Sequence, residues 1–106
     1  DMATQALLIS DTLIKTSGTP SNWDEDNVQV FGLASDDRII SSAMAEKFCA
    51  VPEGDIARIL GVNYLFYFKL GNISCGRIPS GSKTAVVQRD VFFDGRNEKL
   101  EFTLWR

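Results

Sequence analysis

Two runs near the C-terminus alternate between apolar and polar residues, and this alternation constrains the fold more than any other feature. The runs are TAVVQRDVFF (84–93) and EKLEFTLWR (98–106), and Asp-Gly-Arg-Asn joins them. Period-2 alternation on both sides of such a turn predicts a β-hairpin. A loop of two residues (Asp94 and Gly95) or of four (94–97) puts the apolar residues of both strands on one face. A loop of three would put them on opposite faces.

Arg89 interrupts the apolar face that this register predicts. The register places it near Glu98 or Phe102. A charged group buried without a partner is costly. We therefore expect Arg89 to have a polar partner on the inner face of the sheet.

The N-terminal segment 2–16 predicts a helix. Its apolar residues recur at helical spacing, with Ser10 small enough to share their face; they are Ala3, Ala6, Leu7, Leu13 and Ile14. Gly18 stands where a C-terminal cap is expected, and Pro20 confirms the stop. Turn residues after Pro20 direct Trp23 back toward the core, where a tryptophan in such a loop usually packs.

The middle of the chain predicts two short helices followed by a strand. Ser41 or Ser42 begins the first helix, which reaches about Cys49, and Pro52 opens the second, which Gly61 ends. Residues 63–70 read as an aromatic strand, 28–35 as a short extended segment and 74–83 as a Gly/Ser/Pro loop. The predicted fold is α+β. It is one soluble domain over residues 1–106, with the N-terminal helix packed on an antiparallel sheet of three or more strands.

Composition argues against several functions. The net charge is −3 at pH 7 and the chain has no histidine. The negative charge disfavours nucleic acid as a partner. Two distant cysteines do not make a zinc site, and we expect no metal or other cofactor.

Three sequence patterns resemble known catalytic or ligand-binding motifs, but their spacing or their surroundings in the chain do not fit those motifs. GRIPSGSKT (76–84) resembles a phosphate loop, but it has one residue too many and precedes a strand instead of a helix. Ser80 and Lys83 match a nucleophile pair but lie in a loop, and the acidic turn Asp24–Asp26 lacks the alternating ligands of a calcium loop. We therefore predict that the chain is not an enzyme.

Two further features depend on where the protein resides. Cys49 and Cys75 form a disulfide in an oxidising compartment or remain as two buried thiols, and the residues alone do not decide between these alternatives. Asn72-Ile73-Ser74 is a sequon that accepts an N-linked glycan in an exported protein.

Taken together, motifs along nearly the whole chain resemble the extracytoplasmic part of archaeal pilin-like (type IV pilin-related) cell-envelope proteins. In that family a membrane-spanning N-terminal helix continues into a loop that ends in tryptophan, and the chain closes on a β-hairpin. The matching residues are Gly18, Pro20 and Trp23; Gly32, Leu33 and Ala34; Lys47 and Phe48; Leu60 and Gly61; and Arg89, Val91, Phe93 and Gly95.

The resemblance implies a fold, a cellular location and a role. It implies a pilin-like domain at the cell surface, anchored to the membrane by a helix that precedes Asp1, and it favours the Cys49–Cys75 disulfide. It implies a non-enzymatic role in assembly or adhesion, with like subunits or other envelope proteins as partners. The alternative is an extracytoplasmic module that binds a peptide, sugar or ion, for which we expect a concave pocket lined by Trp105 and Tyr67.

Overall fold

The C-terminal hairpin forms the centre of the sheet. In a computed structural model that describes residues 1–106, β5 (Thr84–Phe93) and β6 (Arg96–Trp105) pair antiparallel along their full lengths. Phe93 pairs with Arg96, so the loop has two residues, and Asp94 and Gly95 have φ values of 48° and 84°. Positive φ at both central positions is typical of a type I′ turn. The predicted shared apolar face of the two strands is confirmed.

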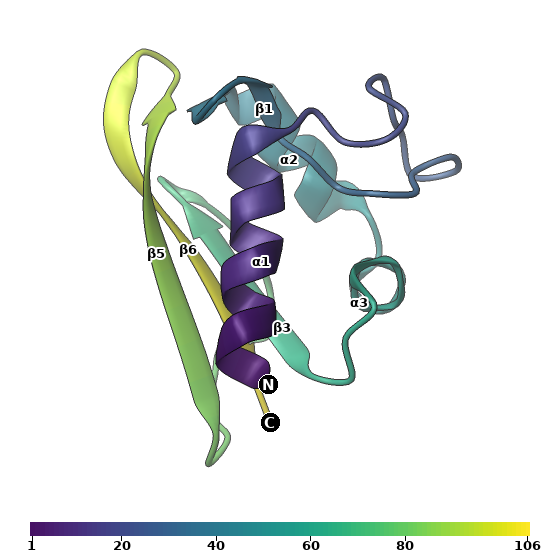
Figure 1. The fold of residues 1–106 in the computed structure, drawn as a ribbon, viewed down its shortest axis with the longest axis vertical. Coiled ribbons are helices and arrows are strands. Elements are labelled where there is room, and N and C mark those ends of the chain that lie inside the picture. Colours follow the sequence, from purple (N-terminus) through teal and green to yellow (C-terminus); the bar gives the residue numbers. More distant parts are fainter.

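The protein is α+β, with three helices and a six-stranded sheet in the order β1-β2-β5-β6-β3-β4. The remaining elements are α1 (Met2–Lys15), β1 (Ala34–Asp36), β2 (Ile39–Ile40), α2 (Ser42–Ala50), α3 (Glu53–Leu60), β3 (Leu65–Leu70) and β4 (Ile73–Gly76). Figure 1 shows α1 running along the hairpin, and the two termini at the same end of the long axis. No helix has the length and apolar character needed to cross a membrane.

The sheet is mixed, so the expectation of a purely antiparallel sheet is wrong. β2 lies parallel to β5, whereas every other neighbouring pair is antiparallel. The N–H groups of Phe92 and Asp94 donate to the carbonyls of Arg38 and Ile40. A strand of two residues is too short to show a periodicity, which is why the sequence pattern does not reveal it.

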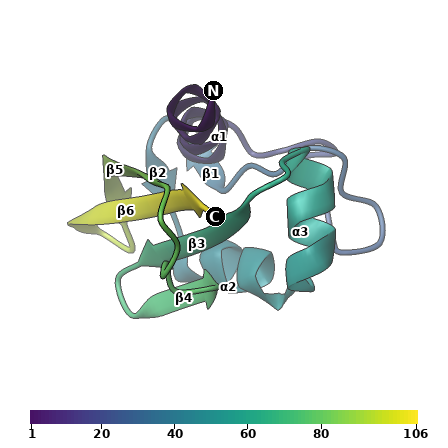
Figure 2. The same ribbon diagram turned by 90° about the horizontal axis from the view of Figure 1, so that it is seen from below.

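The helices lie on one face of the sheet, and the sheet curls around the core between them. α1 packs on β5 and β6, and α2 packs near β4, so Figure 2 shows α1 by one rim of the curl and α2 by the other. An aromatic series crosses the interior: successive rings of Trp23, Phe31, Phe48 and Phe68 lie 5.0–5.3 Å apart. These contacts join the 20–31 loop to the inner face of the sheet.

The C-terminal end of α1 is held by backbone hydrogen bonds from a later part of the chain. The carbonyls of Leu13, Ile14 and Thr16 accept from the N–H groups of Leu33, Arg38 and Ala34, at 2.7–2.9 Å. These carbonyls have no partner within a helix and need one elsewhere. The cap is Thr16 in an extended conformation. The prediction that Gly18 caps this helix is therefore wrong.

Gly18 is required instead by close packing beyond the helix. Its φ is +88°, and a Cβ there would lie 2.7 Å from Trp23 Cδ1 and 2.8 Å from the nitrogen of Gly32. A Cβ on Gly32 would in turn lie 2.2 Å from the nitrogen of Gly18. Pro20 accepts a hydrogen bond from the N–H of Trp23, which closes the turn that returns the indole to the core. Trp23 is fully buried, as its loop position predicts.

The two short helices begin and end near the predicted residues. The Ser41 side chain caps α2 by accepting from the N–H of Met44, and Pro52 precedes α3. Gly61 ends α3 in the left-handed conformation that glycine adopts readily. The loop predicted for 74–83 is wrong at its start, because residues 74–76 belong to β4 and pair with β3.

Candidate interaction surface on the first helix

One side of α1 is sealed against the sheet and the other faces solvent. The buried residues of the helix are Ala6, Ser10, Leu13 and Ile14. Two residues that the periodicity assigned to this face lie outside it, because Ala3 is exposed and the Leu7 side chain is 51% exposed. Met2 and Ile9 are partly buried against the core, whereas Leu7 and Leu8 are left exposed.

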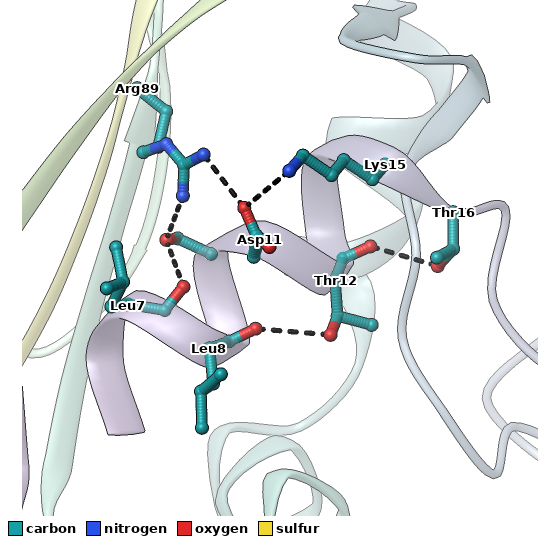
Figure 3. Close-up of polar contacts among 8 residues, drawn as sticks. Leu7, Leu8, Asp11, Thr12, Lys15, Thr16 and Arg89 are labelled. Atoms are coloured by element: carbon teal, nitrogen blue, oxygen red, sulfur yellow. Dashed lines mark hydrogen bonds and ion pairs between the residues drawn. The ribbon is translucent and has the colours of Figure 1, made fainter. Parts of the chain in front are cut away.

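Arg89 binds the sealed side of the helix. Its guanidinium donates to Ser10 Oγ at 3.3 Å and to Asp11 Oδ1 at 2.8 Å. Figure 3 shows Arg89 directed at Asp11 on the helix. The side chain is only 15% exposed. Opposite it on β6 stands Leu100, not Glu98 or Phe102. The expected polar partner exists, and it comes from α1.

Asp11 lies between two cations. Arg89 and, from the next helical turn, Lys15 both approach Oδ1, the latter at 3.2 Å. The hydrogen bond from the Arg89 guanidinium, followed by that from Lys15, holds the pKa of the Asp11 carboxyl below its usual value of 3.8. Ionised Asp11 therefore helps to fix α1 on the sheet at neutral pH.

The solvent side of α1 carries no charge over most of its length and exposes two leucines. No residue from Met2 to Ser10 carries a charge, and Leu8 is 60% exposed. In Figure 3 the Leu8 side chain points away from Arg89 and the sheet. An ordinary surface helix has charged or polar residues on its outer side. Leu7 and Leu8 together form what we call the open face of α1.

A shallow apolar groove adjoins this open face. It has a volume of about 190 Å³ and runs between α1, the segment 29–31 and the end of α3. Val30 on its rim is 44% exposed. The lining residues are Leu8, Ile9, Thr12, Leu13, Gln29, Val30, Phe31, Ile59 and Leu60.

Sequence reasoning did not find this groove, because three segments far apart in the chain build it. One signal was available in the sequence: the uncharged run 2–10 contains more apolar residues than one buried stripe can use. Leu8 falls outside the predicted core positions. Its exposure is what that surplus predicts for a helix that covers a sheet with only one side.

The structure places the cysteines together. Cys49 at the end of α2 and Cys75 in β4 form a disulfide, with 5.4 Å between their Cα atoms. The bond links a helix to an edge strand across 26 positions of the chain. Asn72, the sequon asparagine, lies in the turn between β3 and β4, where it is exposed.

The residues of the other candidate patterns do not line the groove beside the open face. The Asp24 carboxylate accepts from the N–H groups of Asp26 and Asn27 and so serves its own turn. No group of three or more His, Cys, Asp or Glu residues is arranged to hold a metal ion. The main chain of Lys83 exchanges two hydrogen bonds with that of Arg106, and Ser80 is exposed.

The pocket that would indicate a ligand-binding module is not formed by the expected residues. Neither Trp105 nor Tyr67 lines any of the four surface depressions. Trp105 is 7% exposed, and its Nε1–H donates to the carbonyl of Arg77 at 2.9 Å. The segment after β4 thus packs against the indole where we expected an open pocket.

Comparisons with protein-family models, with curated proteins and with solved structures find no match for this chain.

Proposed function

We propose that this chain is the non-enzymatic, extracytoplasmic domain of a membrane-anchored, pilin-like envelope protein, and that it assembles through the open face of α1. The observation that carries this proposal is the exposure of Leu7 and Leu8 on a helix that is uncharged from Met2 to Ser10. Leu8 also lines the apolar groove beside the helix, and exposed apolar side chains that extend such a groove are a candidate interaction site.

The partner that fits best is the corresponding helix of a neighbouring copy. The groove beside α1 is apolar, and the side chains that protrude next to it are leucines. A second α1 presents the same uncharged, apolar side, so contact between two copies buries no unpaired charge. The resemblance to pilin-like proteins, in which the N-terminal helix packs against neighbouring subunits, points to the same arrangement.

The small size of the face supports assembly on a membrane. A stable interface buries about 800 Å² on each partner. Three partly exposed side chains, Leu7, Leu8 and Val30, supply only a fraction of that area. Contacts this small become effective when an anchor concentrates the subunits, as an upstream membrane helix would. The Cys49–Cys75 disulfide supports the extracytoplasmic address, because such bonds persist in oxidising compartments.

Sedimentation of the purified chain over a wide concentration range tests the proposal. We expect weak, concentration-dependent association of the wild type and none in Leu8→Glu, since a carboxylate on the open face would be buried by the contact. Ile78→Glu is the matched control, because Ile78 is 76% exposed and lies outside α1. Far-UV circular dichroism checks that both variants are folded.

Two outcomes would count against assembly through α1. One is a wild type that remains monomeric up to millimolar concentration. The other is equal loss of association in Leu8→Glu and Ile78→Glu. That result would mean that an added negative charge prevents association wherever it lies on the surface.

A further inference from the structure

Asn72 stands in an exposed turn with the hydroxyl that N-glycosylation requires two residues away. The chain has five asparagines, and only Asn72 is followed by the Asn-x-Ser pattern. We propose that Asn72 carries an N-linked oligosaccharide. This inference rests on the proposed function in one respect: the domain must be exported to meet the enzyme that attaches the glycan.

The local geometry presents both sequon side chains to solvent. Leu70 pairs with Ile73, so Gly71 and Asn72 form a two-residue turn, and Gly71 has a φ of 60°. Asn72 and Ser74 are exposed, whereas Ile73 between them packs against the core. This is the alternation of a strand with one face buried. A transferase can therefore reach Asn72 and Ser74 while Ile73 stays packed against the core.

The side-chain amide of Asn72 makes no hydrogen bond within the chain. Asn27 provides the contrast, since its Oδ1 accepts from the N–H of Asp24 at 2.6 Å and stabilises its own turn. No such hydrogen bond ties the side chain of Asn72 to the rest of the chain. A sugar on its Nδ2 breaks no interaction that the structure needs.

The position also suits a glycan because β4 is an edge strand. β4 is the last strand in the order of the sheet, and Ile73–Gly76 contains no charged residue and no proline. Edge strands present unpaired N–H and C=O groups that invite pairing with other chains. An oligosaccharide at the start of β4 shields this edge. It also leaves the open face of α1 clear, because α1 packs on β5 and β6, while β3 separates β6 from β4 (Figure 2).

The modification is a transfer from a lipid-phosphate-linked oligosaccharide. The Asn72 Nδ2 forms a bond to the anomeric carbon of the first sugar, and the bond from that carbon to the phosphate oxygen of the lipid breaks. The lipid phosphate leaves with the electron pair, and the amide loses one proton to a base of the transferase. The exposed Ser74 hydroxyl is the recognition element of the sequon.

Mass spectrometry of the peptide that contains Asn72, from protein made in its native host, tests the assignment. We expect a wild-type peptide heavier by whole sugar residues, with the added mass lost in Asn72→Gln and in Ser74→Ala. Ser74→Thr is the matched control, because it preserves the sequon and should retain the glycan. Both changes at Ser74 are at an exposed position, so folding is not the variable.

The state of the cysteines separates the two ways in which the proposal fails. An unmodified Asn72 in protein whose Cys49 and Cys75 are bonded overturns the glycan and leaves the exported domain standing. An unmodified Asn72 with both thiols free overturns the glycan and the extracytoplasmic address together. A sugar that persists in both Asn72→Gln and Ser74→Ala lies elsewhere and also overturns the assignment.

Discussion

Replacing Trp23 with phenylalanine tests whether the loop after α1 is held by one buried indole. Trp23 Nε1–H donates to the carbonyl of Gly32 at 3.0 Å, and both residues are buried. Phenylalanine retains a ring against Phe31 but leaves that carbonyl without its donor, which costs about 1–3 kcal/mol. The smaller ring also buries roughly 50 Å² less apolar area, or about 1 kcal/mol. We expect Trp23→Phe to lower the free energy of unfolding by about 2–4 kcal/mol.

The same substitution at Trp105 provides the matched control. Trp105 Nε1–H donates to the carbonyl of Arg77, an exposed residue, so water can replace the lost donor. The main cost is then the smaller buried apolar area of phenylalanine. We expect Trp105→Phe to lower the free energy of unfolding by about 1–2 kcal/mol. Urea unfolding followed by far-UV circular dichroism measures both variants without depending on tryptophan emission. The reasoning is refuted if Trp105→Phe is as destabilising as Trp23→Phe.

Two further predictions concern the attachment of the helices to the sheet. Because the pKa of Asp11 is lowered in the folded chain, the stability that its ionisation contributes is complete above pH 3.8 and is lost as the pH falls below that value. The urea midpoint of Asp11→Asn should therefore fall less steeply on acidification than that of the wild type, and parallel curves would contradict the assignment. Replacing Cys49 and Cys75 with serine opens a loop of 26 positions and should cost about 3–4 kcal/mol in the chain-entropy model. A reductant should cause a similar loss in the wild type and none in the double variant, and an unchanged urea midpoint in that variant would reject this expectation.

Local patterns predicted those elements whose cause is local. The shared apolar face of the hairpin followed from the alternation of apolar residues, but this alternation allowed a loop of two or of four residues, and the structure has the shorter one. Ser41 and Gly61 indicated where α2 begins and α3 ends. Each of these features depends on residues within a few positions of one another, so a single sequence contains the information.

Features that depend on distant contacts escaped prediction. The role of Gly18 comes from Gly32, which approaches it from another segment, and a cap was the only local interpretation. β2 and β4 are stabilised by neighbouring strands, not by a pattern of their own. The need of Arg89 for a partner was predictable, but Ser10 and Asp11 became candidates only once α1 was placed on the sheet.

The backbone of Arg38 has a mechanical consequence. Its N–H donates to the carbonyl of Ile14 at the end of α1, and its carbonyl accepts from Phe92 in β5, both at 2.7 Å. A pull along the axis of α1 therefore passes through peptide groups directly into the longest strands of the sheet. If the domain is tethered through its helix, part of the tension reaches the hairpin through this one residue.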